Sequence, residues 1–394
     1  MYILGLNAFH GDSSACLLKN GVLIAAAEEE RFSRIKHCAG FPVEAIRWCL
    51  NEGKIDLKDI EHLSLNQDRK ANFIRKIFYT ISKRPSFELL IEKFRNKQER
   101  LNLNYHLPKA FPDNEFKGSI HQVEHHICHL SSAFHVSPFN KAVVLSVDGF
   151  GDFASTAWGV GNGTKIDLEE RIYFPHSLGN FYQALTQFLG FYNYGDEYKV
   201  MGLAPYGEPA YMDEMREIVL KKSDNTFELN LNYFRHHSEK IDYQWEYGSP
   251  HVGVLFSKEL EKLLGPERSK NEEITQRHKN IAHSVQAIYE EAFFILLNKL
   301  YLKYNLDNLA LAGGCGMNSV ANGKILLKTP FKKVYVQAAA GDAGGALGAA
   351  LMTWHKVGGK NAKKKVTPHT HAYWGPSFSN DDIIDLIKSK NSRI

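Results

Sequence analysis

The residues best suited to chemistry are two histidines, His125 and His129, and an aspartate that follows them in the chain. On a helix, residues four apart lie on one face one turn apart, so both imidazoles would point the same way. The apolar run 142–147 predicts a strand that ends at Val147, and Asp148 follows it as the first residue of the glycine-rich turn 148–152. Imidazole and carboxylate groups suit a divalent metal, and backbone N–H groups in such a turn can hold phosphate. Metal and phosphate together suggest a nucleotide enzyme, although His-x3-His alone is weak evidence.

The composition is that of an ordinary globular chain of 394 residues. The net charge of +4 suits an anionic substrate and does not require a nucleic-acid partner, which we do not expect. Five scattered cysteines without a Cys-x-x-Cys pair predict a reducing, cytoplasmic compartment. No apolar run reaches the length of about 18 residues that a membrane span needs, so no membrane partner is expected.

Two stretches of the chain repeat one order of elements, which predicts an internal duplication. In 2–31 and again in 142–171, a strand, a polar loop, a strand, an Asn-Gly turn, a third strand and a charged run follow one another. Two such β-meanders, each followed by helices, predict an α/β protein of two similar lobes with a cleft between them.

The expected boundaries follow from this duplication. The first lobe is predicted at 1–140, with a basic helical insertion at about 68–110 that is either a solvated face or a capture surface. The second lobe is predicted at 141–355 and includes a substrate-facing excursion at 222–256. Residues 356–394 are predicted to be a linker followed by the start of another domain.

Glycine-rich loops at 313–316 and 341–345 each stand between a predicted strand and a predicted helix. Glycine there lets a ligand approach the backbone and the helix N-terminus closely. Together with 148–152, these loops favour a nucleotide cleft, and tight helix–sheet packing by small residues is the alternative. The stretch 195–207, bounded by glycine and proline, is predicted to be a loop with a buried centre.

Five motifs jointly resemble the O-carbamoyltransferase family of nodulation-factor and antibiotic biosynthesis. They lie at 5–14, 29–37, 123–129, 199–207 and 341–346. The duplicated meander is similar to the actin/Hsp70/sugar-kinase superfamily, which implies duplicated ribonuclease H-like lobes with a nucleotide cleft between them. The His-x3-His helix with Asp148 and Asp342 also resembles the tRNA threonylcarbamoyladenosine transferases. The resemblance covers nearly the whole chain.

The resemblance implies a metal centre made of His125, His129, Asp148 and Asp342. Two imidazoles and two carboxylates suit Fe(II) or a similar divalent metal such as Mn(II) better than a structural zinc. The metal would polarise the phosphate of a carbamoyl-adenylate, which the family makes from carbamoyl phosphate and ATP. The residues implied to line the nucleotide are Gly149, Gly151, Gly313, Gly314 and Asn318.

Two further residues match family positions near the carbamoyl group, His10 and Lys36. A donor or cation there would stabilise the oxyanion that forms when a hydroxyl attacks the carbonyl. From the residues alone, His10 could equally cap its loop and Lys36 could be a solvated surface lysine. The sequence does not place the general base, and a carboxylate within 196–242 is our only suggestion.

The implied function is carbamoyl transfer to the hydroxyl of a small-molecule acceptor, a sugar or another natural product. A small-molecule kinase of the same superfamily and a non-catalytic nucleotide-binding module stay open as alternatives. In the family, a C-terminal YrdC-like domain forms the adenylate, and the motif at 373–378 resembles the entry to it. We therefore expect either a fragment or a chain that uses a YrdC-like domain in trans. A homodimer also stays open.

Overall fold

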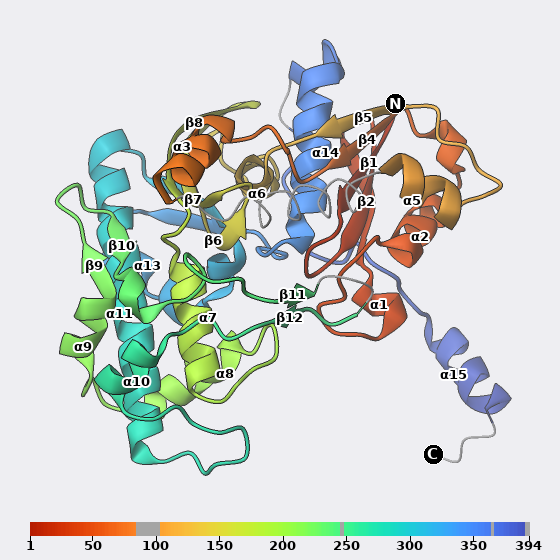
Figure 1. The fold of residues 1–394 in the computed structure, drawn as a ribbon. Helices are drawn as coiled ribbons and strands as arrows, with labels where there is room; N and C mark the ends of the chain where they lie inside the picture. The colour runs from red at the N-terminus through yellow and green to blue at the C-terminus, as the bar shows by residue number, and fades with distance from the viewer. Residues whose placement is uncertain (84–102, 245–247, 364–365, 391–394) are drawn as a thin grey trace.

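Two five-stranded mixed β-sheets form the framework of the chain in this computed structural model (Figure 1). The first sheet has the order β3-β2-β1-β4-β5, and the second has the order β8-β7-β6-β13-β14. The parts of the chain that the structure describes are 1–83, 103–244, 248–363 and 366–390.

The two sheets share one topology. In each, the first three strands pair antiparallel, and the first strand then pairs parallel with the fourth, which pairs parallel with the fifth. The strands are β1 (Tyr2–Asn7), β2 (Ser14–Lys19), β3 (Val22–Glu28), β4 (His62–Leu65) and β5 (Ser119–Gln122), and then β6 (Lys141–Gly151), β7 (Ala154–Asn162), β8 (Lys165–Tyr173), β13 (Asn308–Ala312) and β14 (Lys333–Val336). This confirms the predicted α/β fold with duplicated ribonuclease H-like lobes.

Two helices lie between the sheets and pack on each other, α6 (His125–Phe134) and α14 (Ala343–Val357) (Figure 1). Helix α6 contacts β6 and β13, and α14 contacts β1, β2 and β4. The outer faces are covered by α2 (Val43–Gly53) on the first sheet and by α7 (Leu178–Phe188) and α11 (Gln276–Tyr304) on the second.

The strand periodicity explains this layering, because successive side chains point to opposite faces of a sheet. On β6, Val143 and Leu145 join the core under α7 and α11, whereas Val144 joins the core under α6. On β1, Leu4 packs toward α2 and Ile3 packs toward α14. Each central strand is thus buried on both faces.

The remaining elements are shorter or peripheral. They are α1 (Glu30–Ser33), α3 (Phe73–Lys83), α5 (Leu103–Ala110), α8 (Glu197–Leu203), α9 (Met212–Ile218), α10 (Lys258–Leu264), α12 (Ser319–Asn322), α13 (Ile325–Lys328), α15 (Asn380–Ser389), β9 (Val219–Lys221), β10 (Phe227–Leu229), β11 (Tyr243–Gln244) and β12 (His251–Val252). Of the predicted helical insertion, α3 and α5 are described, and 84–102 lie outside the described residues. None of the described helices is both long and apolar enough to cross a bilayer.

Two expectations about local structure were wrong. Strand β6 does not end at Val147 but runs to Gly151, and its pairing with β7 is irregular between these two residues. A bulge of this kind bends a strand and re-aims its side chains without ending it. The segment 195–207 is not a loop, because its centre forms α8, where the buried Val200 packs against the core under α11.

The approach of α14 to α6 yields a stability prediction. A β-carbon at Gly348 would lie 1.8 Å from the carbonyl oxygen of Cys128 on α6, so the helices can approach this closely only at glycine. We expect Gly348→Ala to lower the free energy of unfolding by about 1–3 kcal/mol, because the backbones must separate. Urea unfolding measures this change.

The control is Gly202→Ala on α8, where a β-carbon would meet nothing within 4 Å. This variant should be neutral or slightly more stable, since alanine favours the helix. Equal stability of the two variants would show that the α6–α14 contact is not tight.

Candidate active site

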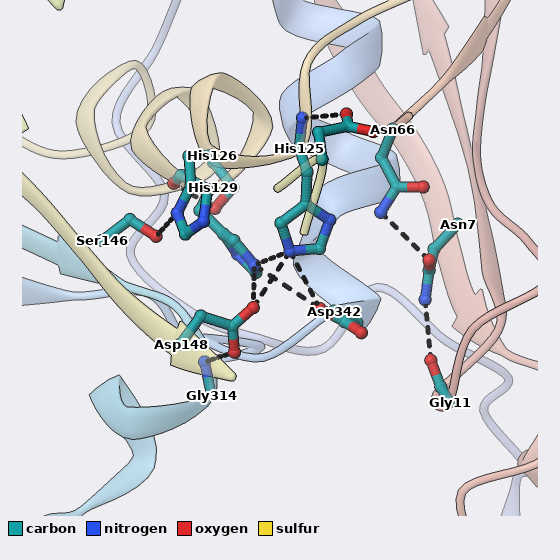
Figure 2. A network of polar contacts seen from close by, with 12 residues as sticks. Asn7, Gly11, Asn66, His125, His126, His129, Ser146, Asp148, Gly314 and Asp342 are labelled. Carbon is teal, nitrogen blue, oxygen red and sulfur yellow. Dashed lines mark hydrogen bonds and ion pairs between the residues drawn. The ribbon is translucent and has the colours of Figure 1, made fainter. Parts of the chain in front are cut away.

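Four side chains converge between α6, β6 and the start of α14 (Figure 2). His125 Nε2 lies 3.0 Å from His129 Nε2, 3.0 Å from Asp148 Oδ2 and 3.4 Å from Asp342 Oδ1. His129 Nε2 lies 3.4 Å from Asp148 Oδ2 and 3.5 Å from Asp342 Oδ1. The structure therefore brings together all four residues that were predicted to bind metal.

Local structure on α6 fixes the histidine pair. Glu124 caps the helix by accepting a hydrogen bond from the N–H of Ile127 at 2.8 Å, and His125 donates its backbone N–H to Asp152 at 3.0 Å. Gly151 on β6 lies under the imidazole, since a β-carbon there would be 1.9 Å from a ring carbon of His125. Gly151 therefore makes room for a histidine, and it does not line the cavity that opens beside this cluster.

The aspartates are held by the glycine loop and by a helix end. Asp148 Oδ1 accepts a hydrogen bond from the backbone N–H of Gly314 at 2.9 Å, which leaves Oδ2 toward the histidines (Figure 2). Asp342 is the N-cap residue of α14, where the helix dipole favours a negative charge. Gly313 has a φ of +92° and lies against the backbone of Val147, so its role is to shape the loop.

The electrostatics of the cluster favour charged forms in spite of burial. Burial lowers the pKa of His125, but the hydrogen bond to Asp148 and the charge of Asp342 outweigh burial and raise this pKa to about 10. Burial raises the pKa of Asp148, but the hydrogen bonds to both histidines hold it well below its usual value. His126, which contacts Ser146 instead of the aspartates, has a pKa lowered to about 4 by burial.

The donor set fits a divalent cation. Ligand atoms 3.0–3.5 Å apart are spaced like neighbouring ligands of one metal with bonds of about 2.0–2.2 Å. Two Nε2 atoms that face each other at 3.0 Å can share only one N–H, whereas one cation satisfies both lone pairs. His125, His129, Asp148 and Asp342 could therefore hold Fe(II), Mn(II) or a similar ion.

A cavity of about 1220 Å³ opens beside this cluster, and both aspartates line it. That volume is ample for a nucleotide together with a second small molecule. The other predicted site residues on its wall are His10, Gly149, Gly314 and Asn318. The ring centroids of His10 and His125 are 5.9 Å apart, so His10 lies beside the cluster.

Lys36 is placed differently from the other predicted site residues. It is exposed and does not line the cavity, whereas its neighbour His37 does. Sequence reasoning did not single out His37 or Asp12, both of which line the cavity. The half-buried Glu197 on the same wall falls within the range 196–242 that was suggested for the general base. His37 and Asp12 belong to the motifs at 29–37 and 5–14, which was the available signal.

The family model described as Carbamoyltransferase N-terminus matches residues 2–351. The chain belongs to this family. That membership confirms the family expected from the five sequence motifs.

An uncharacterized protein of Synechocystis sp. is 38% identical over 397 residues, covering 98% of this chain and 62% of that protein. Nodulation protein NolNO of Sinorhizobium fredii is 32% identical over 380 residues, covering 96% of this chain and 51% of that protein. Nodulation protein NolO of Bradyrhizobium diazoefficiens is 35% identical over 266 residues, covering 67% of this chain and 43% of that protein. The chain thus spans between 43% and 62% of the length of these relatives.

Among solved structures, component A of the (R)-2-hydroxyglutaryl-CoA dehydratase of Acidaminococcus fermentans is similar, with a TM-score of 0.47 and 12% identity. The match covers 90% of this chain and 98% of that chain. A likeness this weak does not bear on function.

The cluster yields a metal-binding prediction. The chain loaded anaerobically with Fe(II) or Mn(II) should retain one ion, and the double variant His125→Ala/His129→Ala should lose it, because two of the four ligands are removed. Retention should also fall as the pH drops, since the ion competes with a proton for His125, whose pKa is raised to about 10. Elemental analysis after gel filtration measures the occupancy.

The matched control is His126→Asn, which changes a buried histidine of the same helix that contacts Ser146. It should keep the metal. Full metal occupancy in the double variant would contradict the assignment of these ligands.

The glycines on the cavity wall yield a nucleotide-binding prediction. A β-carbon at Gly149 would meet nothing within 4 Å, so Gly149→Val places a side chain in the cavity without disturbing the fold. We expect the affinity for AMP or ATP, measured by calorimetry, to fall at least about tenfold. Gly314→Val should weaken binding too, but its β-carbon would lie 2.8 Å from Asp148 Oδ1 and disturb a metal ligand as well.

The control is Gly202→Val, which adds the same side chain in open space away from the cavity wall. An unchanged affinity of Gly149→Val for AMP and ATP would show that this part of the cavity wall does not bind nucleotide.

Proposed function

We propose that this chain transfers a carbamoyl group from carbamoyl-adenylate to a hydroxyl group of a small-molecule acceptor, such as a sugar. One observation carries the proposal: two histidines and two aspartates converge within 3.0–3.5 Å, and the two aspartates line a cavity of about 1220 Å³. Membership of the carbamoyltransferase family supports carbamoyl transfer as the reaction. The proposal that the acceptor atom is oxygen rests on the sequence resemblance.

The donor would bind on the side of the second sheet. A divalent metal such as Fe(II), held by the four-residue cluster, would polarise the phosphate of the adenylate as a Lewis acid. Gly149 and Gly314 leave the wall beside Asp148 without side chains, so a phosphate can approach the backbone closely. Asn318 pairs with Gln286 through two hydrogen bonds of 3.0 and 3.1 Å and caps α12, which keeps this loop rigid.

His10 is our candidate for stabilising the reacting carbonyl. It lies on the cavity wall beside the cluster, where a donated hydrogen bond would meet the negative charge that develops on the carbonyl oxygen. Lys36 is exposed and off this wall, so its catalytic role stays a prediction from the sequence.

A small-molecule kinase of the same superfamily is less well supported. Such a kinase would not need the buried histidine pair, whose Nε2 atoms both face the aspartates. We further propose that a YrdC-like domain, in cis or in trans, forms the adenylate, because carbamoyl phosphate is a poor donor to a weak hydroxyl nucleophile without activation.

The donor can be tested directly. The 394-residue chain should form little carbamate from carbamoyl phosphate, ATP and concentrated glycerol as a surrogate acceptor, and should form it when synthetic carbamoyl-adenylate is supplied. His10→Ala should then lower the rate by about 10²–10³-fold, as expected for the loss of one oxyanion donor. Mass spectrometry of the glycerol carbamate gives the rate.

His121→Ala, a histidine on β5 away from the cavity, serves as the matched control and should keep the rate. Efficient transfer from carbamoyl phosphate by the 394-residue chain alone would contradict the proposal that a YrdC-like domain must first form the adenylate.

A further inference from the structure

A second group of titratable side chains faces the cavity from the first sheet. Asp12 Oδ1 and His37 Nδ1 are 2.6 Å apart, a short and charge-assisted hydrogen bond. Glu30 accepts a hydrogen bond from the backbone N–H of His37 at 2.8 Å, which fixes the backbone from which the His37 imidazole projects. The imidazole is therefore oriented at both its ring and its backbone.

The backbone holds both partners in an unusual conformation. Asp12 has a φ of +56° and His37 a φ of +55°, in the left-handed region that favours glycine. Such residues are strained and cluster at functional sites. Asn7 donates a hydrogen bond to the carbonyl of Gly11 at 3.0 Å, and Asn66 donates one to Asn7 at 3.0 Å (Figure 2). Asn7 also donates to the carbonyl of Asp12 at 2.7 Å. The loop that carries Asp12 is thus held by buried amides.

The tip of the imidazole has access to the cavity. His37 and Gly195 both line it, and the His37 side chain is 30% exposed. A β-carbon at Gly195 would lie 2.1 Å from His37 Nε2, so the tip of the ring lies against Gly195 and any side chain at 195 would displace it. Because Asp12 occupies Nδ1, Nε2 is the atom that can accept a proton from a ligand.

We infer that His37, oriented by Asp12, is the general base that accepts the proton of the acceptor hydroxyl. This inference rests on the proposed function and supplies the base that transfer to a hydroxyl requires. His10 and Asp12 belong to the same loop, so one loop would contribute to stabilising the carbonyl oxygen and to orienting the base. His37 is then a catalytic residue, and Asp12 is a positioning residue.

One bond forms and one bond breaks in the proposed transfer. The acceptor oxygen forms a bond to the carbamoyl carbon while its proton moves to His37 Nε2. The bond between that carbon and the bridging phosphate oxygen breaks, and AMP leaves with the electron pair. The products are the carbamate ester, AMP and a protonated His37, which returns its proton to solvent. No oxidant, reductant or other reactant is needed.

The surroundings of His37 set its pH dependence. Its hydrogen bond to Asp12 raises its pKa, burial lowers it, and the charges of Asp12, Glu30 and Glu197 raise it further, so the net shift is upward. Glu28 also lies within electrostatic reach, and Tyr194 packs edge-on against the ring. A base acts in its neutral form, so the rate should rise with pH through the pKa of His37. Asp12→Asn removes the largest raising influence and should move this rise to lower pH.

The test compares two acceptors with synthetic carbamoyl-adenylate and the metal-loaded chain. Glycerol must lose a proton as it attacks, whereas hydroxylamine attacks as a neutral amine and needs no base beforehand. We expect His37→Gln to slow transfer to glycerol by about 10²–10⁴-fold and to flatten its pH profile. Transfer to hydroxylamine should stay near the wild-type rate. His121→Gln is the matched control and should change neither reaction, because His121 lies on β5 away from the cavity wall.

The outcomes separate the inference from the proposed function. If the wild-type chain transfers the carbamoyl group to neither acceptor, the proposed function fails and the inference falls with it. If the wild type uses both and His37→Gln uses both equally well, only the inference is overturned. Equal losses with both acceptors would indicate a structural role for His37 and overturn it too. Loss of a bound metal ion in His37→Gln would assign Asp12, Glu30 and His37 to a cation and also overturn it.

Discussion

The site depends on one close contact, the backbone of α14 against the backbone of α6. A β-carbon at Gly348 would lie 1.8 Å from the carbonyl oxygen of Cys128, so these helices meet at a distance that only glycine permits. Helix α6 carries His125 and His129, and α14 begins directly after Asp342. Because α6 also packs on β6, the same contact sets both histidines beside Asp148. The neighbouring elements α6 and β6 are thus aligned with the distant helix α14 by backbone packing.

That alignment buries charges, which is costly unless they are paired. An isolated buried carboxylate loses several kcal/mol of hydration free energy, and a like-charged neighbour adds repulsion. Here each aspartate faces two imidazoles, and Asp148 also accepts a backbone hydrogen bond from Gly314. The two imidazoles hold their protons with Nε2 atoms only 3.0 Å apart, and one divalent cation would replace those protons, which is the electrostatic reason for a cation there. The cluster is therefore better explained by ligand binding than by stability.

The sequence predicted the fold and the convergence of His125, His129, Asp148 and Asp342 better than the roles of the glycines. Periodicity and repeated turns were sufficient for the duplicated sheets, and the spacing of His125 and His129 required only a helix. A glycine can make room either for a ligand or for a neighbouring part of the protein. Which of these it does depends on the atoms that lie against it in the folded structure. Gly149 faces the cavity, whereas Gly151 lies against His125. Likewise Lys36 and His37 are adjacent, yet the left-handed backbone at His37 turns this residue to the cavity wall, which no periodicity encodes.

The duplication also explains why two kinds of chemistry can meet in one cavity. β1 and β6 are the central strands of matching sheets, and the segments at their carboxyl ends occupy equivalent places in the topology. The end of β6 carries Asp148 and Gly149, whereas the loop after β1 carries His10 and Asp12. All four line the same cavity. Under the proposed function, one copy of the repeat holds the donor phosphate and the other holds the reacting carbonyl and the base. A transfer reaction needs two such sides that face each other, and helices α6 and α14 between the sheets fix their separation.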